Sequence, residues 1–201
     1  MKHVNISGVI LAGGKSSRMN FNKAFAYVGD KTVIEIICAK FASFFSETII
    51  ISNQPHLYQK YCDKVFVDIY PGRGPMSGIH AAIYHSSNDA IFVLGCDMPF
   101  VNMQIVSYLI SQLNGYDCVI PRVDGYLQTT CGLYTKKCYP VLTECLEKNK
   151  LKLSLTFAQL HTRLVEEEEL APWGNIRESF FNLNDPDTLK KAREISGRLL
   201  K

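Results

Sequence analysis

SGVILAGGKSSRM, residues 7–19, joins a short apolar run to a loop rich in glycine, serine and cationic side chains. The run at 7–11 is bounded by glycine and predicts a buried strand. The loop that follows, 12–22, comes at the carboxyl end of that strand, where ligands bind in open parallel sheets. Its glycines let backbone N–H groups approach phosphate oxygens, and Lys15 and Arg18 add cationic donors. The stretch therefore predicts a phosphate-binding loop in an α/β fold, with a plain polar turn as the alternative.

Outward from this stretch, short apolar strands alternate with amphipathic helices along the chain. The strands are expected at 7–11, 47–52, 64–67, 90–94, 117–121, 130–134 and 179–182. The helices are expected at 32–45, 55–61, 79–85, 105–113, 139–147, 153–160 and 187–195, with a loop at 68–78. Such alternation is typical of βαβ units with right-handed crossovers on a parallel sheet. We therefore expect a three-layer α/β/α sandwich with a mostly parallel, Rossmann-like sheet.

Length and composition place the chain among ordinary globular proteins. Its 201 residues suit a single domain, 1–201, and 47% of them are hydrophobic while 20% are charged. A net charge of +3 is too small to argue for a nucleic-acid partner. No apolar run reaches the roughly 18 residues that a membrane-spanning helix needs, and the run near the N-terminus is too short for a signal peptide. The sequence predicts a cytoplasmic protein with neither a nucleic-acid nor a membrane partner.

Cysteine and histidine usage argues against a disulfide framework and against a metal cluster. The seven cysteines are odd in number and include no C-x-x-C pair, which indicates a reducing compartment. Cys131, Cys138 and Cys145 recur every seven residues, and we expect them to be small buried apolar side chains. The five histidines show no metal-ligand spacing and are expected to be structural, and the acidic run 166–169 is expected to be a solvated surface.

Two common nucleotide-binding loops can be excluded for residues 7–19. A P-loop needs a glycine five residues before Gly14, but that position is Val9 and the nearest glycine is Gly8. The dinucleotide-binding pattern G-x-G-x-x-G is absent from the loop as well. The loop therefore belongs to neither common type.

The loop does resemble a third type, and the resemblance continues along the chain. Its pattern is similar to the signature loop of nucleotidyltransferases that join an NTP to a phosphorylated acceptor: Leu11-Ala12-Gly13-Gly14, then Arg18-Met19 and Lys23. The two-glycine form resembles that of the molybdenum cofactor guanylyltransferases of the MobA-like family. Three further matches follow in the family's order: Asp68-x-x-Pro71-Gly72-x-Gly74-Pro75-x-x-Gly78-Ile79, Cys96-Asp97-Met98-Pro99-Phe100 and Phe181-Asn182-Leu183-Asn184-Asp185-Pro186-Asp187. Together the matches span residues 11–189.

The resemblance implies a fold, a reaction and a division of labour between the two halves of the chain. The implied fold is of the nucleotide-diphospho-sugar transferase type. The implied reaction transfers GMP from GTP to the terminal phosphate of the molybdenum-molybdopterin cofactor, which forms molybdopterin guanine dinucleotide and releases pyrophosphate with Mg²⁺ as cofactor. GTP would bind to the N-terminal half and molybdopterin to the C-terminal half. Transient contact with molybdenum-inserting proteins and molybdoenzyme chaperones is implied as well.

The resemblance also implies roles for individual residues. The implied catalytic residues are Asp97, Arg18 and Lys23, with Asp97 as the metal ligand. The implied nucleotide-binding residues are Leu11, Ala12, Gly13, Gly14, Lys23, Asn53, Asp68, Gly74, Gly78 and Asp97, and the implied acceptor-binding residues are Asn182 and Asn184. Gly13 stands where cytidylyltransferase relatives usually carry alanine and leaves room for a purine edge, so GTP is expected to be preferred over CTP and ATP.

For Asp97 and Asn53, which are expected in turns after strands, a purely structural role is the alternative to ligand binding. Asp97 follows a strand and precedes proline, so it suits a Mg²⁺ ligand that phosphates and water complete, but aspartate also caps helices. Asn53 ends another strand; it could be a plain turn residue, and Ser52 beside it could take its place in the alignment.

The C-terminal motif has two readings. If the segment is extended, Asn182 and Asn184 point to one side and offer amide donors and acceptors to a pterin, while Leu183 faces the core. Alternatively, the two asparagines cap the last helix.

The sequence departs from the family pattern in three places, and two rival functions stay open. Asn20 replaces a usual glycine, Asn22 replaces a usual aspartate beside Lys23, and Thr129 replaces a frequent proline of the acceptor half. The rivals are a nucleotidyltransferase with a different base or acceptor and a non-catalytic nucleotide sensor that kept the fold. A sensor need not keep the metal carboxylate.

Overall fold

The computed structural model describes residues 4–13 and 22–199 of the chain. An eight-stranded sheet forms the centre of the molecule. Its strands lie in the order β10-β7-β9-β6-β1-β4-β5, with β8 paired to β7. Their bounds are β1 Val4–Leu11, β4 Phe45–Ile51, β5 Val65–Phe66, β6 Ala90–Gly95, β7 Cys118–Val123, β8 Tyr126–Leu127, β9 Cys131–Thr135 and β10 Thr162–Glu166. A separate small hairpin joins β2 Tyr27–Val28 to β3 Lys31–Thr32.

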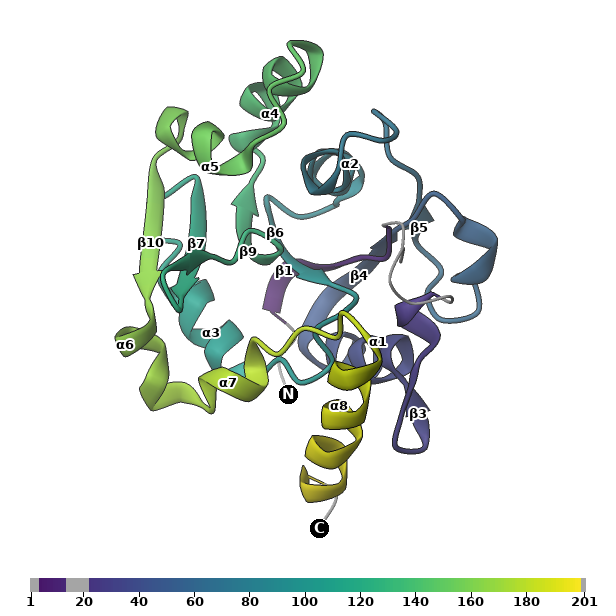
Figure 1. Cartoon of the computed structure of the whole chain (residues 1–201). Helices are drawn as coiled ribbons and strands as arrows, with labels where there is room; N and C mark the ends of the chain where they lie inside the picture. Colours follow the sequence, from purple (N-terminus) through teal and green to yellow (C-terminus); the bar gives the residue numbers. More distant parts are fainter. Residues whose placement is uncertain (1–3, 14–21, 200–201) are drawn as a thin grey trace.

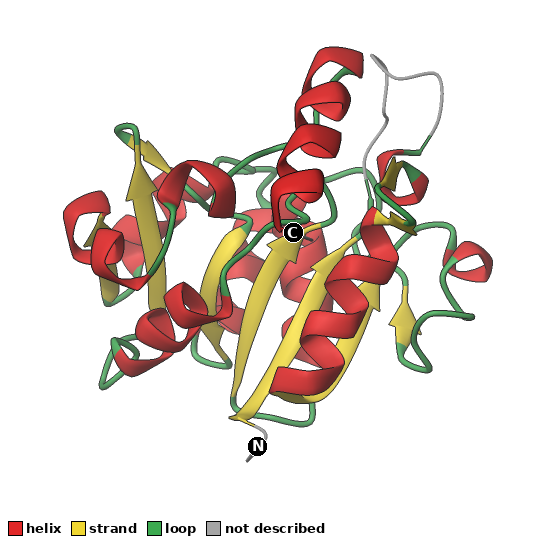
Figure 2. Cartoon of the chain, turned by 90° about the horizontal axis from the view of Figure 1, so that it is seen from below, coloured by secondary structure: helices red, strands yellow, loops and turns green. Residues whose placement is uncertain are grey.

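Helices cover both faces of the sheet and make three layers (Figures 1 and 2). They are α1 Val33–Phe44, α2 Pro75–His85, α3 Met103–Ser111, α4 Cys138–Glu147, α5 Leu153–Thr156, α6 Glu167–Leu170, α7 Ile176–Ser179 and α8 Pro186–Leu199. One apolar core packs α1, α3 and α8 against one face, and a second core packs α2, α4 and α5 against the other. The predicted three-layer sandwich with a mostly parallel sheet is confirmed.

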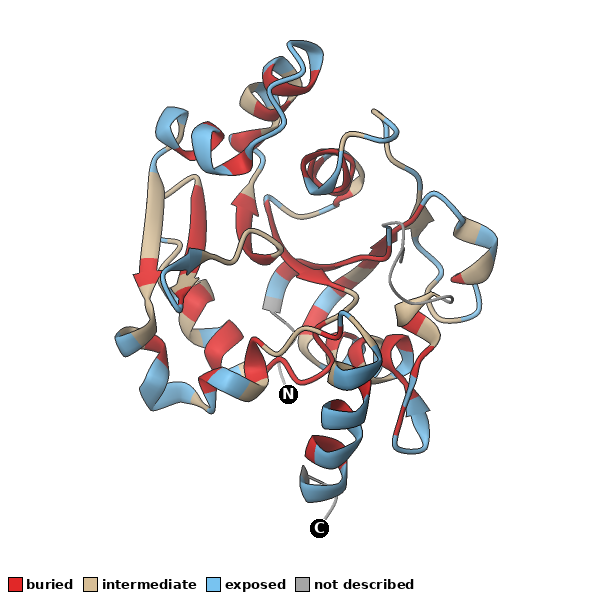
Figure 3. Cartoon of the chain, in the orientation of Figure 1, coloured by how far each residue is buried: buried red, intermediate tan, exposed pale blue. Residues whose placement is uncertain are grey.

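Burial follows this layering (Figure 3). Every residue of β6, near the middle of the sheet, is buried, whereas β1 and β4 each keep an exposed residue near their start. Cys131, Cys138 and Cys145 are buried as predicted, so their seven-residue spacing reflects packing. None of the helices in the described part of the chain is long and apolar enough to cross a membrane.

Strand β9 runs against its neighbours, a direction that its sequence did not reveal. It pairs antiparallel with both β6 and β7, and Cys131 lies opposite Leu94. The reversal comes from the β7–β8 hairpin, whose turn residues Asp124 and Gly125 both have positive φ, as tight two-residue hairpin turns require. As a result, the start of β9 lies at the same edge of the sheet as the end of β6.

Several expected elements differ from those observed. The expected strand at 179–182 is wrong: residues 176–179 form α7, capped by the Asn175 side chain, and 181–184 pair with no strand. The short apolar stretch there packs into the core without a neighbouring strand edge. Strand β10 at 162–166 was not predicted, because its alternation is weak; in the structure it pairs with β7 and buries Val165 in the core.

Three expected helices also have different bounds in the structure. Helix α2 begins at Pro75, inside the expected loop 68–78, because Gly74 with φ 68° ends the loop and proline suits the first helical turn. The expected helix at 55–61 is only a 3₁₀ turn at Pro55–Leu57, and that at 153–160 divides into α5 and the 3₁₀ turn Phe157–Gln159.

The acidic run 166–169 is a partly exposed surface with ionic partners. Glu166 and Glu169 form a capping box at the start of α6. Glu166 also pairs with Arg122 at 3.0 Å, and Glu169 pairs with Arg163. The run therefore begins a helix and joins it to β7 and β10.

Gly8 lies inside β1 for a packing reason. A Cβ at this position would come within 2.7 Å of Phe41 Cδ2 and would also collide with the ring of Phe45. Phe41 and Phe45 belong to the apolar core beneath the sheet, and their rings lie 4.9 Å apart. Gly8, which lies one residue before the position that a P-loop glycine would occupy, therefore makes room for the rings of Phe41 and Phe45.

We expect Gly8→Ala to lower the free energy of unfolding by about 1–3 kcal/mol, the usual cost of overpacking a tight core. Gly197→Ala in α8 is the matched control, because a Cβ there meets nothing within 4 Å, and it should leave stability unchanged or raise it by up to about 1 kcal/mol. Chemical denaturation of both variants is the measurement. Equal stability of the two would show that the rings move aside freely.

Candidate active site

The carboxyl ends of three neighbouring parallel strands meet at one edge of the sheet (Figure 1). Leu11, the last residue of β1, pairs with Ile51 of β4 on one side and with Gly95 of β6 on the other. The backbone N–H of Ala12 donates to the Ile51 carbonyl at 2.9 Å, and that of Cys96 donates to the Leu11 carbonyl at 3.1 Å. The turns that follow these strands are therefore adjacent, as the sequence predicted.

On one side of β1 the structure brings four of the predicted nucleotide-binding residues together. Asn53 Nδ2 donates to Asp68 Oδ2 at 2.9 Å, and the Asp68 N–H donates to Asn53 Oδ1 at 3.4 Å. A Cβ on Gly78 would lie 3.0 Å from Leu11 Cδ2 and 3.7 Å from Asp68 Oδ1, so α2 approaches both closely. Ser52 is buried and its hydroxyl accepts from the Gln54 N–H, whereas Asn53 is exposed. Of the two adjacent candidates, Asn53 is the one that the solvent and a ligand can reach.

Two predicted glycines border open space. A Cβ on Gly13 or on Gly74 would meet nothing within 4 Å. Gly74 has φ 68° and precedes α2, so a glycine is needed there to turn the chain into the helix. The open space at Gly13 accords with the expected room for a purine. Two other predicted residues, Gly14 and Arg18, lie outside the described residues.

On the other side of β1, Asp97 projects back over Gly95. A Cβ on Gly95 would lie 2.7 Å from Asp97 Oδ1 and 3.6 Å from Thr130 Oγ1. The Gly95 N–H donates to the Thr130 carbonyl at 2.8 Å, which places Thr130 beside the carboxylate. Helix α3 is capped by Asn102, whose side chain accepts from the Gln104 N–H. Asp97 therefore does not act as the cap of the next helix.

The C-terminal motif lies directly on the turn that holds Asp97. The Leu183 N–H donates to the Asp97 carbonyl at 2.9 Å, and Leu183 itself is fully buried, as expected. Lys23 Nζ donates to Asn184 Oδ1 at 2.8 Å. A predicted catalytic cation is thus bonded to a predicted acceptor-binding amide. Phe181 adds a ring contact, 6.1 Å between centroids, to Phe100.

The helix-cap reading of the two asparagines is not what the structure shows. The Thr188 N–H donates to Asp185 Oδ1 at 2.8 Å, and the Leu189 N–H donates to the Asp185 carbonyl at 3.0 Å. Asp185 therefore caps α8. Asn182 Nδ2 donates to the Phe180 carbonyl at 3.1 Å.

The pKa values of the carboxylates at the two edges of the sheet are shifted in opposite directions. At the far edge, burial acts to raise the pKa of Glu47, but hydrogen bonds from Lys64, Ser7 and Ser87 outweigh it and lower the pKa to about 2. At the candidate site, burial raises the pKa of Asp97, which nearby Lys23 only partly offsets, and burial likewise raises that of Asp68. Within the described residues, the donors and charges near Asp97 and Asp68 therefore offset burial less than those around Glu47 do, and a bound cation would stabilise the ionised forms.

The donor set at this edge suits Mg²⁺ held mainly by substrate. Within the described residues, no group of three or more His, Cys, Asp or Glu side chains could hold a metal ion by itself. Mg²⁺ often binds through one or two carboxylates together with phosphates and water. Asp97, half-buried and with an elevated pKa, fits the role of that single carboxylate.

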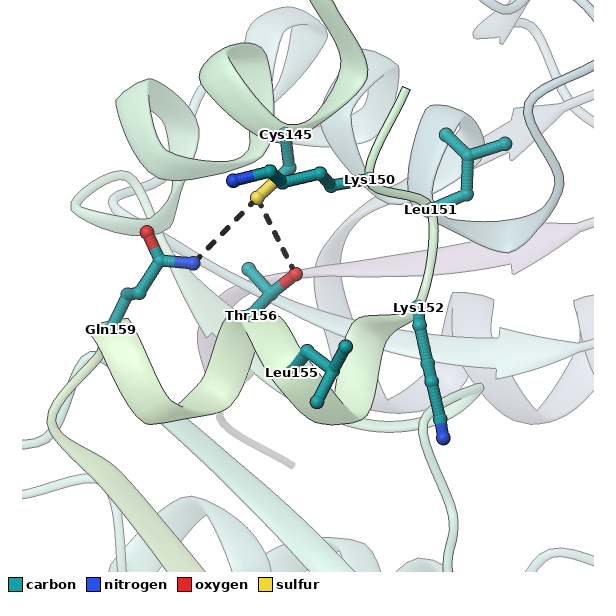
Figure 4. A pocket seen from close by; sticks show the side chains of 7 residues that line it. All are labelled: Cys145, Lys150, Leu151, Lys152, Leu155, Thr156 and Gln159. Carbon is teal, nitrogen blue, oxygen red and sulfur yellow. Dashed lines mark hydrogen bonds between the residues drawn. The ribbon is translucent and has the colours of Figure 1, made fainter. Parts of the chain in front are cut away.

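One cavity of the described residues lies away from this edge and is lined by none of the predicted site residues. It has a volume of about 370 Å³ and lies between α4 and α5, around Cys145, Lys150 and Leu155 (Figure 4). There Cys145 Sγ accepts weak hydrogen bonds from Thr156 and Gln159 at 3.6 and 3.9 Å. The candidate active site is the open edge of the sheet, which a nucleotide and an acceptor would complete.

Comparison with known proteins agrees with this geometry. The family profile of the MobA-like NTP transferase domain matches residues 8–163. A Clostridium perfringens protein named "Probable molybdenum cofactor guanylyltransferase" is 42% identical over 195 residues, which cover 94% of this chain and 98% of that protein. A protein of the same name from Pelotomaculum thermopropionicum is 35% identical over 190 residues, 94% of this chain and 93% of its own. The crystal structure of molybdopterin-guanine dinucleotide biosynthesis protein A from Archaeoglobus fulgidus superposes with a TM-score of 0.85 at 27% identity, covering 96% of this chain and 100% of that one.

Fold, site and relatives define an enzyme of the nucleotidyltransferase class, built on the nucleotide-diphospho-sugar transferase type of fold. The chain belongs to the MobA-like NTP transferase family and, within it, to the molybdenum cofactor guanylyltransferases. The family membership expected from the motifs of residues 11–189 is thereby confirmed. The roles of the individual residues stay predictions.

The sequence analysis missed two residues that shape the site. Gly95 directly precedes the Cys96-Asp97 motif. The glycine itself was the available signal, because glycine before a functional turn often marks a close approach of the backbone to another group. Thr130 was placed only in a strand, and its position beside Asp97 follows from the antiparallel pairing of β9.

We expect Gly95→Ala to lower the nucleotidyl-transfer rate about 10–100-fold, the usual effect of disturbing the support of a metal ligand. The added methyl group would occupy the space of Asp97 Oδ1 and displace the carboxylate. Initial rates of the single variant, of Asp97→Asn and of the double variant form a cycle. If Gly95→Ala acts through Asp97, it should add little further loss in the Asp97→Asn background; a full additive loss would contradict this explanation.

Proposed function

We propose that this enzyme transfers GMP from GTP to the terminal phosphate of the molybdenum-molybdopterin cofactor, forming molybdopterin guanine dinucleotide and releasing pyrophosphate in a Mg²⁺-dependent reaction. One observation carries the proposal: the hydrogen bond from Lys23 to Asn184 together with that from Leu183 to Asp97. These two bonds join Lys23 to the 181–187 motif and that motif to the turn of Asp97, which supports a shared site for nucleotide, metal and acceptor. The names of the relatives supply the guanylyl group and the cofactor.

The chemistry needs no covalent intermediate on the protein. An oxygen of the acceptor's phosphate attacks the α-phosphorus of GTP, and pyrophosphate leaves. The chain's own task is to hold the two substrates in line and to offset negative charge. Lys23 supplies a cation at the reacting phosphates, and Arg18 is proposed to supply a second. Mg²⁺, when bound at Asp97, would neutralise charge on the transferred group.

We propose that one domain, 1–201, divides its labour between two halves. The N-terminal half would hold GTP with Leu11, Ala12, Gly13, Gly14, Asn53, Asp68, Gly74 and Gly78. The open space at Gly13 supports a purine there. The C-terminal half would hold molybdopterin with Asn182 and Asn184. We place the reaction in the cytoplasm, where the seven free cysteines would stay reduced, and we propose transient contact with molybdenum-inserting proteins and molybdoenzyme chaperones.

Pyrophosphate release is the direct test of this function. We expect turnover with GTP and molybdenum-molybdopterin in Mg²⁺, and much slower turnover with CTP or ATP, because a site that hydrogen-bonds one base leaves polar groups unpaired with another. Asp97→Asn should lower the rate about 100-fold or more. Asp89→Asn is the matched control, since Asp89 is an exposed carboxylate at the other edge of the sheet.

The outcomes of this assay separate the rival functions. Equal turnover with CTP would contradict the base preference, and turnover with a different phosphorylated acceptor alone would contradict the pterin. Nucleotide binding without pyrophosphate release under any acceptor would identify a sensor. A near-normal rate of Asp97→Asn in Mg²⁺ would show that the metal assignment is wrong.

The acceptor assignment has a separate test in the C-terminal motif. We expect Asn182→Ala to weaken molybdopterin binding and to leave GTP affinity nearly unchanged, because we propose that its side-chain amide offers a donor and an acceptor to the pterin. Asn184→Ala should also lower the rate, since it releases Lys23. Asp185→Ala is the control for capping and should cost about 0.5–2 kcal/mol of stability without changing acceptor affinity. Binding titrations and thermal unfolding distinguish these effects, and a folded Asn182→Ala protein with normal acceptor affinity would refute the assignment.

A further inference from the structure

A lysine from outside every matched motif holds the turn that carries Asp97. Lys40 lies on α1, and its ammonium donates to the carbonyl of Pro99 at 3.0 Å and to that of Val101 at 2.9 Å. These two carbonyls are two and four residues beyond Asp97 in the chain. The bonds join α1, in the layer beneath the sheet, to the backbone that leaves the candidate metal site.

The burial of this contact makes it strong. Pro99 and Val101 are buried, and Lys40 is half-buried beside a cavity of about 290 Å³ that Phe100 and Asn102 also line. Hydrogen bonds from a charged donor are roughly twice as strong as neutral ones, and a low local dielectric strengthens them further. Burial lowers the pKa of Lys40 to about 8, so the ammonium remains charged at neutral pH in a setting that disfavours charge. There its ammonium donates to two backbone carbonyls.

The turn around Asp97 is then held from two sides. Leu183 bonds the Asp97 carbonyl from the C-terminal segment, and Lys40 bonds the next part of the same turn from α1. Within the turn, the Met98 N–H bonds the Gly95 carbonyl at 3.2 Å. Without Lys40, the stretch from Pro99 to Val101 would lose its polar link to α1, and the direction of the Asp97 side chain would depend on the other two bonds.

We propose that Lys40 is a positioning residue for the metal-binding carboxylate: it fixes the turn after β6 so that Asp97 faces the site with the geometry that Mg²⁺ requires. This inference rests on the proposed role of Asp97 as the metal ligand. Mg²⁺ demands near-ideal octahedral geometry. Small displacements of its protein ligand therefore weaken binding. Partners that orient a ligand typically change metal affinity about 10–100-fold when removed.

The test measures metal binding directly in Lys40→Met, which keeps the length of the side chain and removes both bonds without leaving a buried charge. Mn²⁺ serves as the probe, followed by the loss of its free-ion EPR signal with fixed GTP and no acceptor, against a blank of GTP alone. The Mg²⁺ dependence of pyrophosphate release is measured in parallel. Lys40→Arg is the conservative variant, and Lys31→Met, an exposed lysine just before α1, is the matched control.

We expect Lys40→Met to weaken Mn²⁺ binding about tenfold or more and to raise the Mg²⁺ midpoint of the rate by a similar factor. Saturating Mg²⁺ should restore most of the rate, and the KM for GTP should then be unchanged. Lys40→Arg and Lys31→Met should stay close to wild type. A merely structural lysine would lower the melting temperature and the active fraction but leave both metal midpoints in place, and that result would overturn the inference.

Two further measurements keep the result decisive. If Lys40→Met does not fold, Lys40→Gln supplies the same comparison with a shorter polar side chain. Asp97→Asn is titrated alongside. If Asp97→Asn loses the metal while folded Lys40 variants retain it, only the positioning role fails. If Asp97→Asn itself binds Mn²⁺ normally, the proposed metal ligand is wrong and the role of Lys40 falls with it.

Discussion

The position of β1 between β4 and β6 is the constraint on which the rest of the site depends. Both pairings are parallel, so all three strands end at one edge, with Leu11 beside Ile51 and Gly95. Parallel strands need long crossovers, and the helices in those crossovers cover both faces of the sheet. Side chains that follow separate strands thereby gather without being close in sequence. The antiparallel β9 adds its starting residues to the same edge.

The carboxylates at the two edges of the sheet differ in how far hydrogen bonds and charges offset their burial. At the far edge Glu47 is buried but receives donors from three side chains, so it is satisfied and stays ionised. At the carboxyl edge Asp68 and Asp97 are half-buried, and burial raises their pKa values because, within the described residues, nearby donors and charges offset it only in part. A carboxylate in this state is stabilised when a ligand supplies a cation. We therefore propose that the carboxyl edge, and not the far edge, is the one that binds.

Residues of the site differed in how far the sequence could predict them. Asn53 and Asp68 each follow an apolar strand. Because the carboxyl ends of parallel strands meet at one edge of the sheet, the sequence predicts that the two residues lie together, and the structure shows a hydrogen bond between them. Gly95 and Lys40 carry no such signal. Their importance comes from contacts across the fold: the carboxylate above Gly95, and the turn that Lys40 reaches from α1. A lysine in an amphipathic helix is usually a solvated side chain, so only its burial reveals another role.

The sequence by itself determined the layers and the family, because strand and helix periodicity and short motifs are local properties of the chain, and it predicted that the first loop binds phosphate. It also determined which turns carry the carboxylates. The tertiary structure decided the direction of β9, the pairing of β10 and the lack of a partner among the described strands for the expected strand at 179–182. Each of these depends on which distant segment offers a hydrogen-bond partner or an apolar face, and such long-range competition leaves no mark in a local pattern.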